Sequence, residues 1–159
     1  HILLGAGPTG GAPRLTGTRG ATAELWDAAS GRAIGEPWRH VGAMQQAQFS
    51  PDGRRVITAS SENVAQLWDA EDGHRVGSAL RHEGEIVAIG FSADSRRVIT
   101  GSRDHTDQVC ESETGKVVRV FRPETEGLAV SLSFDGQRGV VVTGPNHSRR
   151  TGDVVSGHD

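Results

Sequence analysis

The sequence predicts an all-β protein made of consecutive antiparallel sheets, each with four strands. Three observations predict this fold class. The twelve residues from Phe49, "FSPDGRRVITAS", recur from Phe91 as "FSADSRRVITGS", with nine identical positions and a spacing of 42 residues. Short runs rich in β-branched or alternating apolar residues are separated by turn residues. No stretch shows the sustained periodicity of a helix.

Within one repeat, the strand and turn signals follow each other in a fixed order. The first strand alternates apolar and polar residues, and the turn "SPDG" follows, in which Pro fixes φ and Gly accepts a positive φ. The second strand is β-branched, and the third ends in Trp-Asp. The turn "EDG" then leads to a fourth strand. In the unit that starts at His40, the four expected strands are 44–49, 54–60, 64–69 and 74–80.

Further landmarks divide the whole chain into four such units. Trp26-Asp27 and Trp68-Asp69 are 42 residues apart, "LSFDGQRGVVVTG" from Leu132 repeats the opening motif, and "TGDVV" from Thr151 matches the last turn and fourth strand. The last unit is about six residues short before Thr151, which weakens the prediction of its third strand. We therefore expect a single domain over 1–159, with units of roughly 1–39, 40–81, 82–122 and 123–159.

A unit of this length, with His before the first strand and Trp-Asp at the end of the third, resembles the WD-repeat family of β-propellers. The chain departs from the family pattern at Cys110-Glu111, which replaces Trp-Asp, and at Gly20 and Glu62, which replace the turn aspartate that Asp104 keeps. The resemblance implies a ring of roughly six to eight blades. Four units therefore predict an incomplete, open propeller that is a fragment of a longer ring. The alternatives are two copies that associate through open blade edges, or a closed ring of four blades.

The resemblance also implies a structural hydrogen-bond network in each blade, formed by His, Ser or Thr, Asp and Trp. In such a network Trp can only donate, an ionised Asp can only accept, and the other two can do both. We expect these residues to tie turns to strands and not to catalyse a reaction, and Cys110 cannot replace the indole donor. Carried onto this chain, the network comprises His40, Thr58, Glu62 and Trp68 in the second unit, and His82, Thr100 and Asp104 in the third.

In function, the resemblance implies a scaffold or interaction module that binds protein partners through one loop face of the propeller. An alternative is a sensory or regulatory repeat region of a larger multidomain protein, such as one attached to a kinase. No catalytic site and no cofactor are expected. The residues that follow each His or precede each turn acid form the predicted partner surface: Val41, Ala43, Ser61, Glu83, Glu85, Arg103, Glu124 and Glu126.

A third function, dinucleotide binding, is suggested by the amino-terminal glycines. Gly5, Gly7 and Gly10 follow an apolar run and satisfy the pattern G-x-G-x-x-G. In that fingerprint a helix must follow, because its amino end binds the pyrophosphate. Here Pro13 and Gly17 interrupt the segment that follows. We therefore interpret the glycines as part of a degenerate first strand and turn.

Two polar features have both a functional and a structural interpretation. Arg54-Arg55, Arg96-Arg97 and Arg138 recur after the first turn of each unit, so they form either a basic arc for an acidic partner or phosphate, or solvated strand ends. His105 and Asp107 suggest a metal site beside Asp104, but no further ligand has useful spacing. A polar turn is the simpler interpretation there.

Composition excludes several classes of protein. The net charge is −3 with both signs interspersed, so no nucleic-acid partner is expected. No apolar run approaches the ~20 residues that cross a bilayer, so no membrane association is expected. The single cysteine, Cys110, excludes an internal disulfide and indicates a reducing, cytoplasmic location, with the thiol itself in a buried strand.

Overall fold

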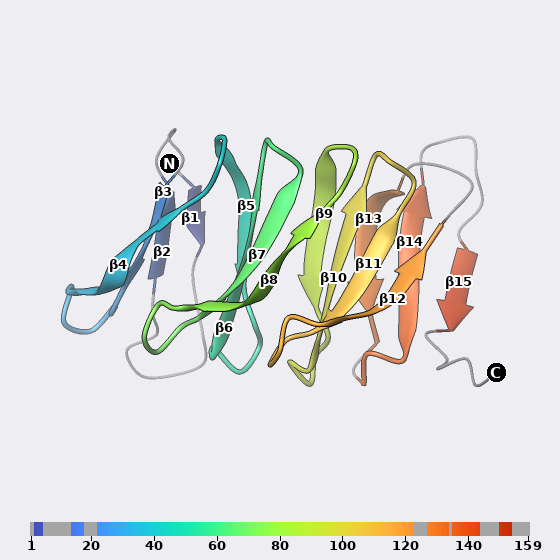
Figure 1. Ribbon diagram of the computed structural model, residues 1–159. Coiled ribbons are helices and arrows are strands. Elements are labelled where there is room, and N and C mark those ends of the chain that lie inside the picture. Colours follow the sequence, from blue (N-terminus) through green and yellow to red (C-terminus); the bar gives the residue numbers. More distant parts are fainter. Residues whose placement is uncertain are drawn as a thin grey trace.

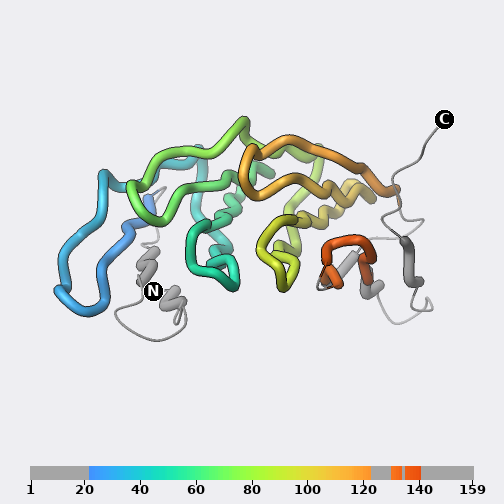
Figure 2. The backbone as a smooth tube through the Cα atoms, turned by 90° about the horizontal axis from the view of Figure 1, so that it is seen from below, coloured from blue at the N-terminus to red at the C-terminus, as the bar shows by residue number. Residues whose placement is uncertain are grey.

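All regular structure in the part of the chain that is described is β-structure. The computed structural model describes residues 2–4, 14–17, 22–122, 127–133, 135–143 and 150–153. Within these ranges, the strands form four antiparallel sheets and there is no helix. The sheets stand side by side in chain order (Figure 1) and follow an open arc when viewed along the strands' length (Figure 2). The prediction of an incomplete propeller built from antiparallel blades is confirmed.

In each sheet the strands are paired in the order in which they occur along the chain. The first sheet contains β1 (Ile2–Leu4), β2 (Arg14–Gly17), β3 (Thr22–Trp26) and β4 (Ala33–Arg39). The second contains β5 (Met44–Phe49), β6 (Arg55–Ser60), β7 (Val64–Asp69) and β8 (Arg75–Arg81). The third contains β9 (Ile86–Phe91), β10 (Arg97–Ser102), β11 (Asp107–Glu111) and β12 (Val117–Phe121). The fourth contains β13 (Gly127–Leu132), β14 (Arg138–Thr143) and β15 (Arg150–Asp153).

The hydrophobic core lies between the sheets, because alternate residues of the middle strands face opposite neighbours. Val56 and Trp68 pack with Trp38 in a cluster that joins the first and second sheets. Ile57 and Leu67, one residue along on the same strands, belong to a cluster that joins the second and third sheets. Both faces of β6 and β7 are therefore covered, and their residues read as nearly continuous buried runs.

Neighbouring sheets also touch backbone to backbone at their outer strands. Gly35 in β4 and Gly77 in β8 have φ values of +67° and +64°. A Cβ on Gly35 would lie 2.8 Å from the carbonyl oxygen of Asp72, and one on Gly77 would lie 2.4 Å from that of Thr114. Each of these outer strands therefore presses on the last turn of the next sheet. The third outer strand, β12, contains no glycine.

The fourth sheet differs from the sequence-based expectation. Thr151 and Gly152 match the last turn of the other units in sequence, but in the structure they belong to β15. This strand occupies the third position of the sheet, where Arg138 is paired with Asp153 and Val140 with Thr151. The shortening of the chain before Thr151 explains the change. Because about six residues are missing there, residues that form the last turn in the other units pair with β14 in this sheet.

Two other features bear on function. Among the residues described, no helix is long and apolar enough to cross a membrane. At the amino terminus, β1 and β2 pair antiparallel, with Leu4 opposite Leu15. Gly5, Gly7 and Gly10, the glycines of the dinucleotide hypothesis, lie outside the described residues.

Candidate functional site

The second sheet contains a hydrogen-bonded chain of His40, Thr58 and Trp68. The indole Nε1 of Trp68 donates to Thr58 Oγ1 at 2.8 Å, and His40 Nε2 lies 2.5 Å from the same oxygen. Thr58 lies on β6 and is fully buried, Trp68 lies on β7, and His40 lies in the connection that enters β5. The chain therefore ties an inter-sheet connection to the two middle strands.

The Trp68 ring is enclosed from three sides. Trp38 of the first sheet stacks on it with the ring centroids 4.8 Å apart and an interplanar angle of 9°. The guanidinium of Arg75 lies 5.3 Å from the Trp68 ring centroid, and His40 meets the ring edge to face. Trp38 is itself fixed, because its Nε1 donates to the carbonyl oxygen of Gly73 at 2.8 Å. Sequence reasoning missed Trp38, although it occupies a strand position that faces the next sheet.

The third sheet contains a second chain, centred on His82, whose side chain has no exposed surface. His82 Nε2 lies 2.8 Å from Thr100 Oγ1, and Nδ1 lies 2.9 Å from Thr106 Oγ1 and 3.3 Å from Asp104 Oδ2. The Thr106 hydroxyl donates to Asp104 Oδ1 at 2.5 Å, so Thr106 can only accept from the histidine. His82 Nδ1 therefore carries the proton, and Nε2 accepts from Thr100.

The titration of these groups is set by burial and hydrogen bonding. Burial lowers the pKa of His82, and the nearby Asp104 carboxylate only partly opposes this. Burial also lowers the pKa of His40, with a further contribution from Arg75. Burial alone would raise the pKa of Asp104, but hydrogen bonds from Thr106 and from the Glu83 N–H outweigh it and lower the pKa to about 2. At neutral pH His40 and His82 are therefore neutral, and Asp104 is ionised.

In this arrangement His82 is enclosed by its structural partners. A general base must reach its substrate, whereas the His82 side chain has no exposed surface and bonds to protein groups through both ring nitrogens. Within the described ranges, no group of three or more His, Cys, Asp or Glu side chains is placed to hold a metal ion. Asp107, which sequence reasoning placed beside Asp104 as a possible ligand, is buried in β11, and His105 occupies the turn before it.

The two hydrogen-bonded chains differ from the network that the family resemblance implies at two residues. Glu62 lies in the turn after β6, and among the described residues no hydrogen bond joins it to His40. Thr106 belongs to the second hydrogen-bonded chain, in the third sheet, although it is not among the residues that the family resemblance implies. Its position two residues after a turn aspartate is a usable signal, because Asp side chains accept hydrogen bonds from groups two residues on.

In the third sheet, Cys110 occupies the position that Trp68 has in the second. It is fully buried and pairs with Val98, as Trp68 pairs with Val56. Thr100 therefore has no indole donor. Burial raises the pKa of the thiol to about 12.

We expect Cys110 to react with iodoacetamide at pH 8 at least ~100-fold more slowly in the folded protein than in denaturant, because alkylation requires an accessible thiolate. Mass spectrometry of quenched time points measures both rates. Similar rates in the two conditions would contradict the burial of this strand.

The connections before β5 and β9 and the turns after β6 and β10, which contain the described members of the predicted partner surface, lie at the upper edge of the sheets (Figure 1). Val41 is 74% exposed. The N–H of Ala43 donates to Ser61 Oγ at 3.0 Å. Arg103 Nε donates to Glu85 Oε2 at 2.9 Å, and both side chains are about half exposed. The described members of this surface are therefore exposed, but several are bonded to one another.

Glu83 is also exposed, and its N–H donates to Asp104 Oδ2 at 2.7 Å. The turn between β6 and β7 is joined to the connection between β8 and β9, because the His82 N–H donates to the Asn63 carbonyl oxygen at 3.0 Å. The connection before β9 is thus held by His82 and Asp104, which also belong to the second hydrogen-bonded chain, whereas Ala43 and Ser61 join the loops before β5 and after β6. Glu124 and Glu126, the other predicted members, lie outside the described residues.

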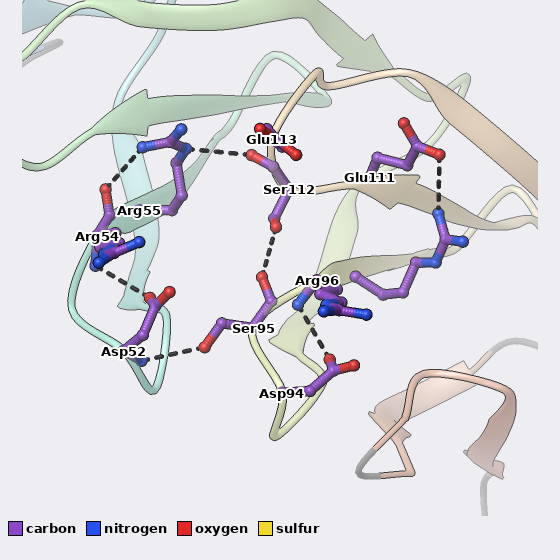
Figure 3. A pocket seen from close by; sticks show the side chains of 10 residues that line it. Asp52, Arg54, Arg55, Asp94, Ser95, Arg96, Glu111, Ser112 and Glu113 are labelled. Carbon is purple, nitrogen blue, oxygen red and sulfur yellow. Dashed lines mark hydrogen bonds and ion pairs between the residues drawn. The ribbon is translucent and has the colours of Figure 1, made fainter.

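Four of the five recurrent arginines line a groove of about 540 Å³ at the opposite edge of the second and third sheets (Figure 3). Arg55 donates to Asp69 Oδ2 at 2.5 Å, and Arg97 donates to Glu111 Oε1 at 3.3 Å. Arg54 and Arg96 are exposed. The groove is lined by four arginines and four acids, so it has no net positive charge: Arg54, Arg55, Arg96 and Arg97 with Asp52, Asp94, Glu111 and Glu113.

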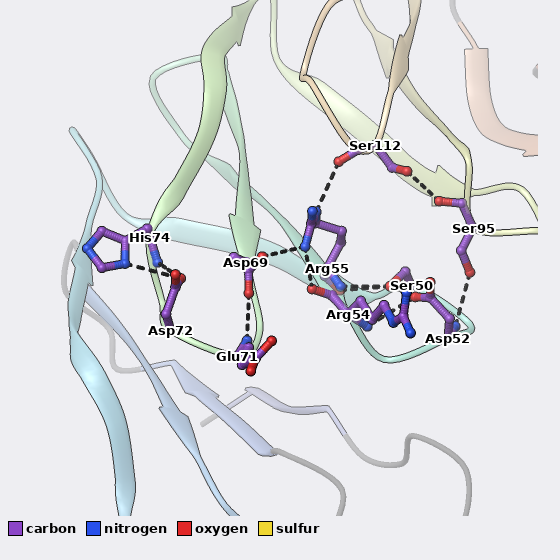
Figure 4. A network of polar contacts seen from close by, with 10 residues as sticks. All are labelled: Ser50, Asp52, Arg54, Arg55, Asp69, Glu71, Asp72, His74, Ser95 and Ser112. Carbon is purple, nitrogen blue, oxygen red and sulfur yellow. Dashed lines mark hydrogen bonds and ion pairs between the residues drawn. The ribbon is translucent and has the colours of Figure 1, made fainter.

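Polar contacts at this groove join the two sheets (Figure 4). Arg55 Nε donates to the Ser112 carbonyl oxygen at 3.3 Å, and the Ser112 hydroxyl donates to the Ser95 carbonyl oxygen. The N–H of Asp52 donates to Ser95 Oγ at 3.0 Å. The arginines and their neighbours therefore stabilise the junction between sheets, which favours the structural interpretation of this repeat over an anion site.

Comparison with known proteins gives one family match. Residues 38–69 and 73–109 each match the family model described as WD domain, G-beta repeat. These residues run from the end of β4 to within β11, and they include both hydrogen-bonded chains. No curated protein matches the chain in sequence.

Proposed function

We propose that the chain, whose residues 38–69 and 73–109 match the WD-repeat family model, is a non-catalytic scaffold that binds protein partners through its upper loop face. WD repeats generally mediate protein interactions, and they are typically not catalytic. The site chemistry supports the same conclusion, because the buried histidines are committed to structural hydrogen bonds.

The observation that carries the proposal is the hydrogen bonding between the loops on this face. The connections before β5 and β9 are bonded to the turns after β6 and β10. Glu83 is held through its N–H by the Asp104 carboxylate, and the exposed side chains of Glu85 and Arg103 hold each other. A surface that is already ordered loses little conformational entropy when a partner binds, and this favours affinity.

We expect the triple substitution Glu83→Ala, Glu85→Ala and Arg103→Ala to abolish capture of a partner by the purified chain. The matched control is Arg54→Ala with Arg96→Ala on the opposite edge, which should leave capture unchanged. Quantitative pull-down followed by mass spectrometry compares the three proteins. Capture by the triple variant at the level of the original protein would show that this face does not bind the partner.

A further inference from the structure

Asp107 is a buried carboxylate at a position where the first two units have a small apolar residue. It is 1% exposed, and neither carboxyl oxygen has a hydrogen-bond partner among the described residues. The equivalent residues, 84 and 42 positions earlier, are Ala23 and Ala65, and both are buried. A buried polar group without a partner is costly, so its presence needs an explanation.

The residue opposite Asp107 leaves room for its side chain. Gly101 pairs with Asp107 in the third sheet, as Gly17 pairs with Ala23 in the first, whereas Ala59 pairs with Ala65 in the second. The third sheet therefore places its carboxyl group opposite a residue that has no Cβ. A Cβ on Gly101 would lie 3.0 Å from Asp107 Oδ1, so alanine there would crowd the carboxylate.

The carboxylate lies where the fourth sheet packs on the third. The same hypothetical Cβ on Gly101 would lie 2.8 Å from Val130 Cγ1, which belongs to β13 (Figure 1 shows β13 beside β10). Ala65, the equivalent residue of the second sheet, belongs to the core cluster shared with the third. Asp107 thus occupies the layer by which each sheet packs on its successor.

The charge state of Asp107 depends on this apolar contact. Burial raises its pKa from 3.8 to about 6, and the nearby Asp104 carboxylate adds to the effect. Gly101 on β10, Phe121 opposite on β12 and Val130 on β13 carry no charge. Asp104, in the turn before β11, is therefore the ionised group that acts on it.

We propose that the junction between the third and fourth sheets is a pH-dependent contact, closed when Asp107 is protonated and weakened when Asp107 is ionised. The carboxyl group lies beside Gly101, as Val130 of the fourth sheet does, and among the described residues it has no hydrogen-bond donor, so its ionisation favours an open junction that admits water. The neutral carboxyl group removes this penalty.

The sign follows from proton linkage. The closed junction holds its proton with a pKa of about 6, whereas the opened carboxyl has its ordinary value of 3.8. The closed form therefore binds more protons between these values, and it becomes less stable as the pH rises through this window. These two values give a decrease of roughly tenfold in the closing equilibrium between about pH 5 and about pH 8. The neutral His40 and His82 have the opposite effect, because their protonation at low pH destabilises the folded protein.

Hydrogen exchange tests the proposal. Amide protection in β13 and β14, corrected for the intrinsic pH dependence of exchange, should fall roughly tenfold between pH 5 and pH 8. Protection in β6 and β7 should not fall in parallel. Equal protection of β13 and β14 at the two pH values would overturn the proposal.

Two variants identify the titrating group. Asp107→Ala recreates the residue of the other units, so the fall in protection should disappear and the junction should be more protected than the original at pH 8. A fall that persists in Asp107→Ala, or lower protection at pH 8, would overturn the proposal. The reciprocal double substitution Ala59→Gly with Ala65→Asp should transfer the pH dependence to β9 and β10, and its absence in that folded variant would also count against the proposal.

Discussion

Trp68→Ala should lower the free energy of unfolding by about 4 kcal/mol, the usual cost of truncating a buried Trp. Trp68 is 3% exposed and supports three different contacts at once. It stacks on Trp38, donates to the buried Thr58 hydroxyl and lies beneath the Arg75 guanidinium. Alanine would leave a cavity between the first and second sheets. Denaturant titration followed by circular dichroism measures the change.

Trp68→Phe is the matched variant, because it keeps an aromatic ring against Trp38 but removes the indole N–H. We expect it to cost about 1–2 kcal/mol, in the range of one lost buried hydrogen bond plus a small packing defect. If Trp68→Ala costs no more than Trp68→Phe, the stacking between the two sheets contributes nothing to stability, and this account of their junction is wrong.

Gly77→Ala should cost about 3 kcal/mol or more, although it adds a single methyl group. The residue has φ +64°, a conformation that costs an L-residue about 1–2 kcal/mol. The added Cβ would also lie 2.4 Å from the Thr114 carbonyl oxygen and 2.8 Å from Gly115 Cα. Both neighbours are backbone atoms that cannot rotate away, so the two sheets must separate. Thermal unfolding in parallel with the original chain measures this.

Gly53→Ala separates the two causes. Gly53 has φ +72°, but a Cβ there would meet nothing within 4 Å. Its substitution should therefore show the conformational cost alone, about 1–2 kcal/mol. Equal losses for Gly53→Ala and Gly77→Ala would mean that the contact between β8 and the next turn is compressible.

The fold could be predicted from the sequence because the repeated landmarks align each strand of one unit with the equivalent strand of the next. With Trp26 and Trp68 at a spacing of 42 residues, every strand and turn between them must recur. The period of two in each strand then decides which side chains face each neighbour. β15 was not predictable in this way, since the six missing residues change which segment pairs with β14.

The candidate site was only partly predictable. His40, Thr58 and Trp68 meet as the family pattern implies, whereas Glu62 does not join them. A glutamate in place of aspartate changes the reach of the side chain, and a motif does not encode that geometry. The burial of Asp107 was also hidden, because an acid beside a turn normally indicates an exposed side chain. The space that Gly101 leaves opposite it is visible only once β10 and β11 are paired.

The contacts between neighbouring sheets are not equivalent. Gly35 and Gly77 allow β4 and β8 to press on the following sheet, but β12 has Arg119 and no glycine, and beside it lies an unpaired carboxylate. Under tension or mild heating, the array should therefore not come apart in one cooperative step. The fourth sheet should detach first, and the first three should persist as the more durable unit.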